Sequence, residues 1–195
     1  MKLKATLLAA GLTLTAGAAA AQDCTNVGVE DFFDLDEDQV VAVYDCLEAK
    51  MAEGYASGDD QVAAEFRSWT ATATRAAVAG PHGNRLLLTF ANDIAAESYL
   101  KFADEIEIPV GSVLAKESIS LSKKKQTARP GPLFIMTKME AGSIPETDDW
   151  LYGGVQPNGK PMKFKQSFCH NCHEGWAEQD NLAYPLEEVR VSSGG

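Results

Sequence analysis

Near its end the chain carries a five-residue motif with the spacing C-x-x-C-H, formed by Cys169-His170-Asn171-Cys172-His173. This spacing is the attachment signature of c-type haem. Two thiols on one helical turn can each bond a haem vinyl group, and the adjacent histidine can then bind the iron. The sequence therefore predicts one covalent haem c. A redox cysteine pair, or half of a zinc site completed by His82 and His170, stays open as an alternative.

The iron's second axial position has no obvious protein ligand. Only 22 residues follow His173 and none of them is Met, which excludes a downstream Met ligand. His82, between Pro81 and Gly83, is interpreted as a turn residue, and His170 is expected to face solvent. Upstream methionines are more typical of the core; they are Met136, Met139 and Met162. We expect an open or water-filled sixth position.

Residues 1–21 have the pattern of a secretory signal peptide. Lys2 and Lys4 precede an apolar stretch, and a run of alanines ends at Ala21. The stretch is too short for a spanning helix, although an uncleaved anchor is the alternative. Cleavage near Ala21 would leave a mature chain of net charge −13 in the periplasm, an oxidising compartment.

Two cysteines lie outside the haem motif. Cys24 and Cys46 most simply pair with each other in an oxidising compartment, and a loop of that length is worth roughly 3 kcal/mol. The alternative is two free thiols. The disulfide would tie the N-terminus to the first predicted helix.

The elements that must position these residues can be read from periodicity. Residues 34–53 predict a helix, capped by Asp34 or Asp36, with one apolar stripe; the stripe is Val40, Val43, Tyr44, Leu47 and Met51. A second helix is expected from Asp59 or Asp60 to about Trp69. Strands are predicted at 70–74, 85–91, 112–121, 132–139 and 150–152, and a helix at 92–103.

These elements predict an α+β fold: an N-terminal helix, a mostly antiparallel sheet interrupted by one or two helices, and a C-terminal haem-attachment loop or helix. We divide the chain into a signal peptide (1–21), a helical extension (22–58) and a haem c domain (59–195). The composition, 45% hydrophobic and 23% charged, is that of a globular protein. The net charge of −11 argues against nucleic acid or an anionic membrane as partner.

From about Phe66 to Pro185 the sequence resembles the cytochrome P460 family, which also contains the β-sheet c-prime-type cytochromes. The similar segments are Phe66–Trp69, Thr89–Asn92, Gly111–Glu117, Met136–Lys138, Asp149-Trp150, Cys169–His173 and Tyr184-Pro185. The strand Gly-Ser-Val-Leu-Ala-Lys-Glu followed by a late C-x-x-C-H is the family-specific part.

The resemblance implies roles for two further residues. Lys116 matches the family's lysine that is covalently bonded to the haem macrocycle, although a solvated strand lysine is the alternative. Strand alternation places Lys116 on the more polar face and Glu117 among apolar residues, where it needs a partner. Phe134 stands near the family's distal carboxylate, which accepts protons during hydroxylamine oxidation; Glu117 and Glu140 are candidate substitutes.

Three hypotheses for function follow from this resemblance. The protein is a P460-type hydroxylamine oxidoreductase with an open iron site and Lys116 at the haem, or a non-enzymatic NO-binding cytochrome of the β-sheet c-prime type. The third is an electron-transfer cytochrome whose sixth ligand is an upstream Met or His82. The acidic charge suits a basic redox-partner protein, and the resemblance implies a homodimer.

Overall fold

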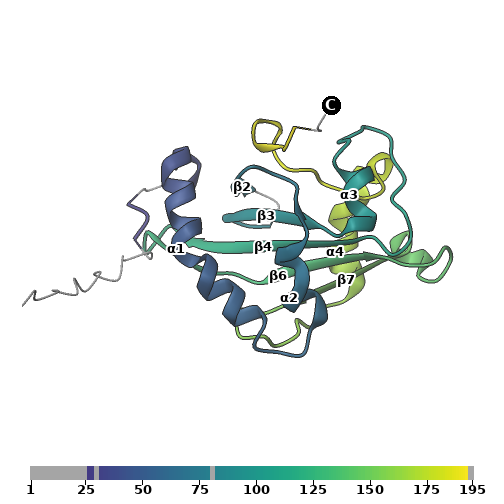
Figure 1. The fold of residues 1–195 in the computed structure, drawn as a ribbon, viewed down its shortest axis with the longest axis horizontal. Helices are drawn as coiled ribbons and strands as arrows, with labels where there is room; N and C mark the ends of the chain where they lie inside the picture. Colours follow the sequence, from purple (N-terminus) through teal and green to yellow (C-terminus); the bar gives the residue numbers. More distant parts are fainter. Residues whose placement is uncertain (1–25, 29–30, 80–81, 193–195) are drawn as a thin grey trace, which may run out of the picture.

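The computed structural model describes residues 26–28, 31–79 and 82–192, which form helices around one antiparallel sheet (Figure 1). The strands are β1 (Thr70–Ala71), β2 (Ala77–Ala79), β3 (Arg85–Ala91), β4 (Val113–Ser122), β5 (Thr127–Pro130), β6 (Leu133–Lys138) and β7 (Trp150–Val155). They lie in the order β1-β3-β4-β6-β7, with β2 paired to β3 and β5 to β4. The helices are α1 (Glu37–Tyr55), α2 (Gln61–Glu65), α3 (Asp93–Tyr99) and α4 (Gln166–His173). The predicted α+β class is confirmed.

Helix α1 begins at Glu37 because Asp36 caps it. The Asp36 carboxylate accepts the backbone N–H of Gln39 at 2.8 Å, and the Gln39 side chain accepts the Asp36 N–H at 3.0 Å. This reciprocal pair is a capping box. The predicted apolar stripe faces inward, with Tyr44 half-buried and the other members fully buried: Val40, Val43, Leu47 and Met51.

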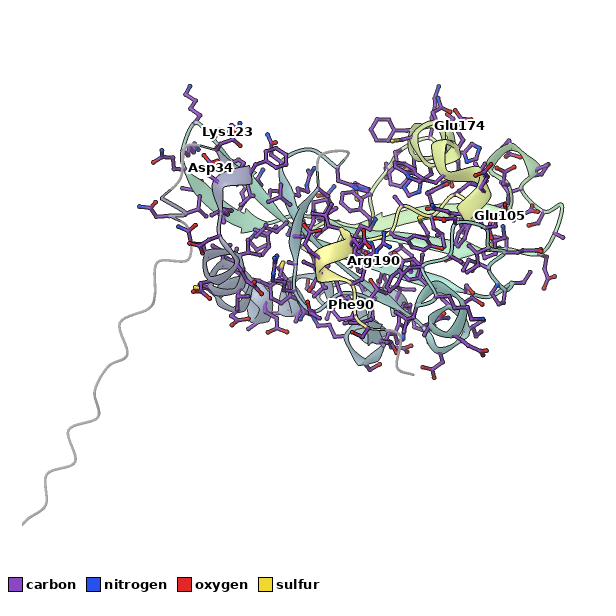
Figure 2. All side chains as sticks on the ribbon, turned by 90° about the horizontal axis from the view of Figure 1, so that it is seen from above. Asp34, Phe90, Glu105, Lys123, Glu174 and Arg190 are labelled. Carbon is purple, nitrogen blue, oxygen red and sulfur yellow. The ribbon has the colours of Figure 1, made fainter. Side chains whose placement is uncertain are left out.

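The two faces of the sheet belong to two different cores. Ala115 and Ile119 of β4 pack with the buried stripe of α1, whereas Leu114 packs with Met136 and Tyr152 on the other face. Figure 2 looks along the sheet and shows Glu174, just after α4, on the opposite side from Phe90, which belongs to the α1 core. The helix with the C-x-x-C-H motif and helix α1 therefore cover opposite faces.

The observed elements differ from the predicted ones at several short segments. Strand β2 was not predicted. The strand predicted at 70–74 forms only at Thr70 and Ala71, and the Thr72 N–H still donates to the Thr89 carbonyl of β3 at 2.9 Å. Thr74 instead donates its N–H to the carbonyl of Val189 at 2.8 Å, because the C-terminal segment comes alongside there. The short strand β5 was not predicted; it forms because the chain turns back onto β4 after the Lys123–Gln126 turn.

Helix α1 shares its core with the sheet. Its buried side chains form one cluster with Phe66, Leu86 and Ile119, which lie in the predicted haem c domain. Five short 3-10 turns complete the described part: η1 (Phe32–Asp34), η2 (Phe66–Ser68), η3 (Pro145–Thr147), η4 (Glu174–Gln179) and η5 (Glu187–Val189). No helix in the described ranges is long and apolar enough to cross a membrane.

Candidate haem site

A cavity of about 960 Å³ lies between the second face of the sheet, α4 and the C-terminal segment. Its size suits a large cofactor. All five residues predicted to contact haem line it: Lys116, Phe134, Cys169, Cys172 and His173. The fold thus brings together side chains that lie as far as 57 positions apart in the sequence.

Strand register explains why Lys116 and Phe134 meet. Lys116 of β4 lies directly opposite Phe134 of β6 on one side and Thr89 of β3 on the other. Residues that are directly opposite in a sheet point to the same face. The next row towards the other end of β4 joins Leu114, Met136 and Tyr152 in the same way. These two rows form the sheet wall of the cavity.

The side chain of Gln166 fixes the start of α4 to the sheet. Its amide oxygen accepts the backbone N–H of Tyr152 at 2.7 Å, and its amide nitrogen donates to the Tyr152 carbonyl at 2.9 Å. Tyr152 lies on β7, the last strand of the sheet. The C-x-x-C-H motif is thereby held beside the cavity, and its two thiols and His173 lie within one helical turn.

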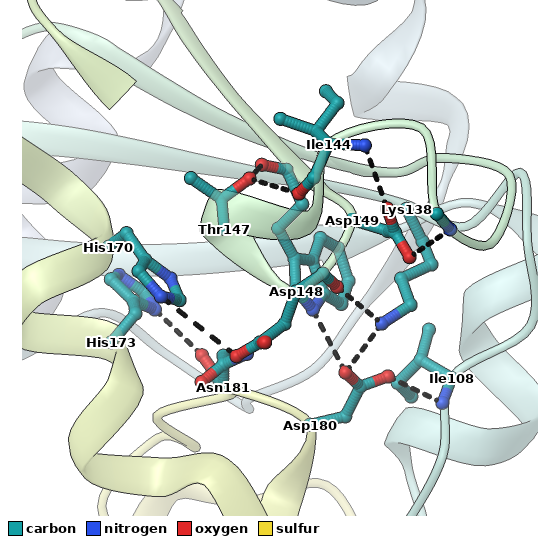
Figure 3. A network of polar contacts seen from close by, with 12 residues as sticks. Ile108, Lys138, Ile144, Thr147, Asp148, Asp149, His170, His173, Asp180 and Asn181 are labelled. Carbon is teal, nitrogen blue, oxygen red and sulfur yellow. Dashed lines mark hydrogen bonds and ion pairs between the residues drawn. The ribbon is translucent and has the colours of Figure 1, made fainter. Parts of the chain in front are cut away.

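The ring of His173 is oriented by a backbone carbonyl. His173 is 8% exposed, and its Nδ1 lies 2.8 Å from the carbonyl oxygen of Asn181 (Figure 3). A carbonyl can only accept, so Nδ1 carries the proton and Nε2 keeps its lone pair. Burial lowers the pKa of His173, which favours the neutral ring. A histidine prepared in this way is suited to bind a metal through Nε2.

A network of polar contacts holds the Asn181 carbonyl in place (Figure 3). Asp180 accepts from Lys138 Nζ at 2.7 Å, from Trp150 Nε1 at 3.1 Å and from the Ile108 N–H at 2.9 Å. Asp180 and Asn181 both adopt left-handed backbone conformations, with φ of 51° and 62°. Such residues persist where their surroundings hold them, and here the hydrogen bonds of Asp180 do so.

Asn181 itself is hydrogen-bonded to a second turn, the one at Asp148. Its side-chain amide donates to the Asp148 carboxylate at 3.0 Å, and Lys138 Nζ donates to the Asp148 carbonyl at 3.0 Å. Sequence reasoning did not identify these residues. The signal that could have found them is the pairs Asp148-Asp149 and Asp180-Asn181. Asp and Asn adopt the left-handed conformation more readily than other residues apart from glycine.

The amine of Lys116 has no salt-bridge partner in the described residues. Burial lowers its pKa to about 8. A larger fraction of the amine is therefore neutral at neutral pH than for a solvated lysine, and only the neutral amine is a nucleophile. Glu117, the next residue, faces the α1 core, where it accepts from Arg67 Nη2 at 2.5 Å and from the Tyr44 hydroxyl.

His82 lies in a turn, as predicted, but its ring also lines the cavity. The ring centroid is 5.0 Å from that of Phe134 and 6.3 Å from that of His173. Burial, aided by the positive charge of Lys116, lowers the pKa of His82 to about 3, so the ring is neutral. Sequence reasoning placed His82 in a turn but did not predict that this turn lies against the cavity.

One expectation is wrong. His170 does not face solvent: its side chain is 12% exposed, and its ring lies beside Tyr152, with Nδ1 3.5 Å from the tyrosine hydroxyl. The reason is that α4 lies against β7. Cys46 is half-buried in α1, while Cys24 and the predicted signal peptide lie outside the described residues, so the disulfide and the export signal remain predictions.

The cavity therefore fits haem c by its donor set: two thiols, a buried imidazole with a free Nε2, and a largely apolar wall opposite. A family model, described as Cytochrome P460, matches residues 63–183. The chain belongs to the cytochrome P460 family. Comparison with curated proteins finds no match.

Cytochrome P460 proteins carry a covalently attached c-type haem, so membership decides between haem and the two alternatives for the C-x-x-C-H motif. The match begins at residue 63 and leaves α1 outside. In this cytochrome P460 chain helix α1 packs mainly in the first core, and Val40 is its one residue that lines the cavity.

Proposed function

We propose that this protein is a haem cytochrome that binds small nitrogen ligands at the iron, on the side of the haem facing Phe134. The observation that carries the proposal is the position of Phe134 in the sheet row beside Lys116, within a wall that also contains Leu114 and Met136. Apolar side chains around an iron face exclude water and favour small neutral ligands such as NO over charged ones.

Each part of the site has a separate task in this proposal. Cys169 and Cys172 hold the macrocycle, His173 binds the iron through Nε2, and the Asn181 carbonyl fixes the ring orientation. The haem supplies the iron centre to which the ligand binds and which exchanges electrons. Phe134 and Met136 shape the space left for a ligand.

Oxidation of hydroxylamine is the second candidate, and Lys116 is the observation that favours it. Lys116 lines the cavity at the position matched to the crosslinking lysine of the family. Against it stands the position of the two carboxylates proposed as substitutes for the distal one, since neither lines the cavity. Glu117 faces the α1 core, and Glu140 is exposed and does not line the cavity. NO binding needs no such proton acceptor, so we rank it first.

The setting that we propose is the periplasm, reached through the signal peptide at residues 1–21. An oxidase or electron carrier would need a redox partner, and the net charge of −11 suits a partner with a basic docking face. We also propose a homodimer, on the family resemblance.

Titration of the reduced holoprotein with NO tests the function. We expect one NO bound per haem, seen by optical and electron paramagnetic resonance spectroscopy. Phe134→Ala should speed NO dissociation because water gains access to the bound ligand. Ile94→Ala, which removes an exposed side chain outside the cavity, is the control. A ferrous protein that forms no nitrosyl complex contradicts the proposal.

A further inference from the structure

The rings of His82 and His173 lie side by side in the wall of the same cavity. Their ring centroids are 6.3 Å apart and their planes are inclined by 66°. Imidazole nitrogens bind transition metals at about 2 Å, so two imidazoles that share one metal ion have ring centroids on the order of 6 Å apart. The observed separation matches a pair of axial ligands.

The main chain of His82 is anchored to the cavity wall. Arg85, the first residue of β3, donates from Nη1 to the carbonyl of His82, and its guanidinium lies 5.8 Å from the ring centroid of Phe134. Arg85 also reaches the Gly83 carbonyl at 3.5 Å. Arg85 thus holds the turn through its backbone carbonyls, while the His82 imidazole lines the cavity.

The nitrogens of the His82 ring are not engaged elsewhere. Within the described part of the chain, no hydrogen bond or salt bridge uses either of them, and the ring contacts are with Phe134 and His173. A neutral imidazole with an available lone pair is the commonest metal ligand among side chains. Of the other groups on this side, Phe134 has no donor atom, and Met136 packs with Trp150 and Tyr152 in the second core.

We propose that His82 is the sixth ligand of the haem iron in the resting protein, and that small ligands bind by displacing it. This inference rests on the proposed function for its second half only. The step is a ligand exchange: the iron–His82 bond breaks, the bond from iron to NO forms, and no electron or proton has to be supplied. It replaces the open sixth position that the sequence suggested.

The spin state of the ferric holoprotein tests whether His82 is the sixth ligand. We expect a six-coordinate low-spin spectrum in the wild type and a high-spin spectrum in His82→Ala. Imidazole added to His82→Ala should restore the low-spin form, and His82→Met should also remain low-spin with an altered reduction potential. The control is Ile94→Ala, which removes an exposed side chain outside the cavity. It should stay low-spin.

The affinity for NO tests whether small ligands bind by displacing His82. A protein that holds its own ligand binds an external one with an affinity reduced by the fraction of molecules that are open, so His82→Ala should bind NO at least about tenfold more tightly. Haem content and circular dichroism verify that the variant is loaded and folded.

The outcomes separate the two proposals. A high-spin ferric wild type that binds NO overturns the role of His82 and keeps the proposed function. A low-spin wild type that turns high-spin in His82→Ala, when neither protein binds NO, keeps the role of His82 and overturns the proposed function. A low-spin spectrum that persists in His82→Ala also overturns the inference.

Discussion

His173 owes its orientation to the carbonyl of Asn181, eight residues further along the chain. No side-chain substitution removes that acceptor, because it is a backbone carbonyl. Its position depends on the left-handed residues Asp180 and Asn181 and on the hydrogen bonds that the Asp180 carboxylate accepts. The Lys138–Asp180 pair that holds this turn is almost fully buried, with side chains 13% and 9% exposed.

Replacing Asp180 should therefore affect both stability and the iron. Loss of one partner of a buried, hydrogen-bonded ion pair costs on the order of 3 kcal/mol, so Asp180→Ala should lower the free energy of unfolding by about that amount. Asp180→Asn keeps the left-handed residue type and should cost less. Chemical denaturation and the reduction potential of the haem are the measurements.

The control for this prediction is Lys123→Ala, which breaks the exposed ion pair with Asp31. Exposed pairs contribute little to stability, so neither the denaturation midpoint nor the potential should change measurably. Equal effects of the two substitutions would show that the buried network does not position His173.

Lys116 gives a second prediction at this scale. If it is bonded to the macrocycle, Lys116→Ala should convert a red-shifted ferrous Soret band to that of an ordinary c haem and abolish hydroxylamine turnover, while both thioether bonds remain. If it is only a neighbour, the spectrum should barely change. Lys125→Ala, in the exposed turn before β5, is the control. Loss of covalent haem in Lys116→Ala would contradict both versions.

At the scale of elements, strand β4 separates two environments one residue apart. Lys116 lines the cavity, and Glu117 is buried against α1. Burial raises the pKa of Glu117 to about 7, against the opposing effects of Arg67 and the Tyr44 hydroxyl. The strand that carries Lys116 is thus linked through Glu117 to the N-terminal helix.

The raised pKa of Glu117 predicts a pH dependence of stability. The folded protein binds more protons than the unfolded one between the ordinary value of 4.5 and about 7. The stabilising contribution is therefore complete below pH 4.5 and is lost as the pH rises through 7. Glu117→Gln cannot titrate, so the wild-type free energy of unfolding minus that of the variant should fall across this window.

The slope of that difference is at most ~1.4 kcal/mol per pH unit. Urea denaturation of both proteins from pH 4.5 to 8 measures it. Tyr44→Phe removes a hydrogen bond that favours the ionised carboxylate, so it should move the window to higher pH. A difference that is flat with pH would show that Glu117 does not titrate in this range.

Local sequence signals predicted the long elements well and the contacts between them poorly. The stripe of α1 and the strand 85–91 follow from periodicity alone, and the alternation of β4 placed Lys116 and Glu117 on opposite faces. The pairing of Lys116 with Phe134 depends on strand register, which was not predicted; the family resemblance implied only that each residue lies near the haem. The turn at His82 was predicted, but its position at the cavity was not, and His170 was wrongly expected to face solvent. The packing of turns and of α4 onto the sheet is not encoded in nearby residues.

For the molecule as a whole, the segment before the matched family region has a structural role. Helix α1 packs across the sheet into the same core as Phe66 and Leu133. Anything that fixes the chain before α1 should therefore stabilise the entire domain, and the predicted Cys24–Cys46 bond would do so by restricting the unfolded chain.

This disulfide can be tested directly. Alkylation of the unfolded, unreduced holoprotein should label neither Cys24 nor Cys46, and the double variant Cys24→Ser with Cys46→Ser should lose roughly 3 kcal/mol of stability. Reduction before alkylation is the control, because it should expose both thiols. Labelling of both residues without reduction would contradict the pairing.

The two hydrogen bonds between the Gln166 side chain and the Tyr152 backbone also matter before any haem is attached. Strand β7 ends the sheet, and the free backbone groups of an edge strand are a template for pairing with another chain. By accepting the N–H and donating to the carbonyl of Tyr152, the Gln166 amide takes the place of a neighbouring strand at that residue. Helix α4, which carries the C-x-x-C-H motif, thus also shields an edge through which the apoprotein could otherwise aggregate.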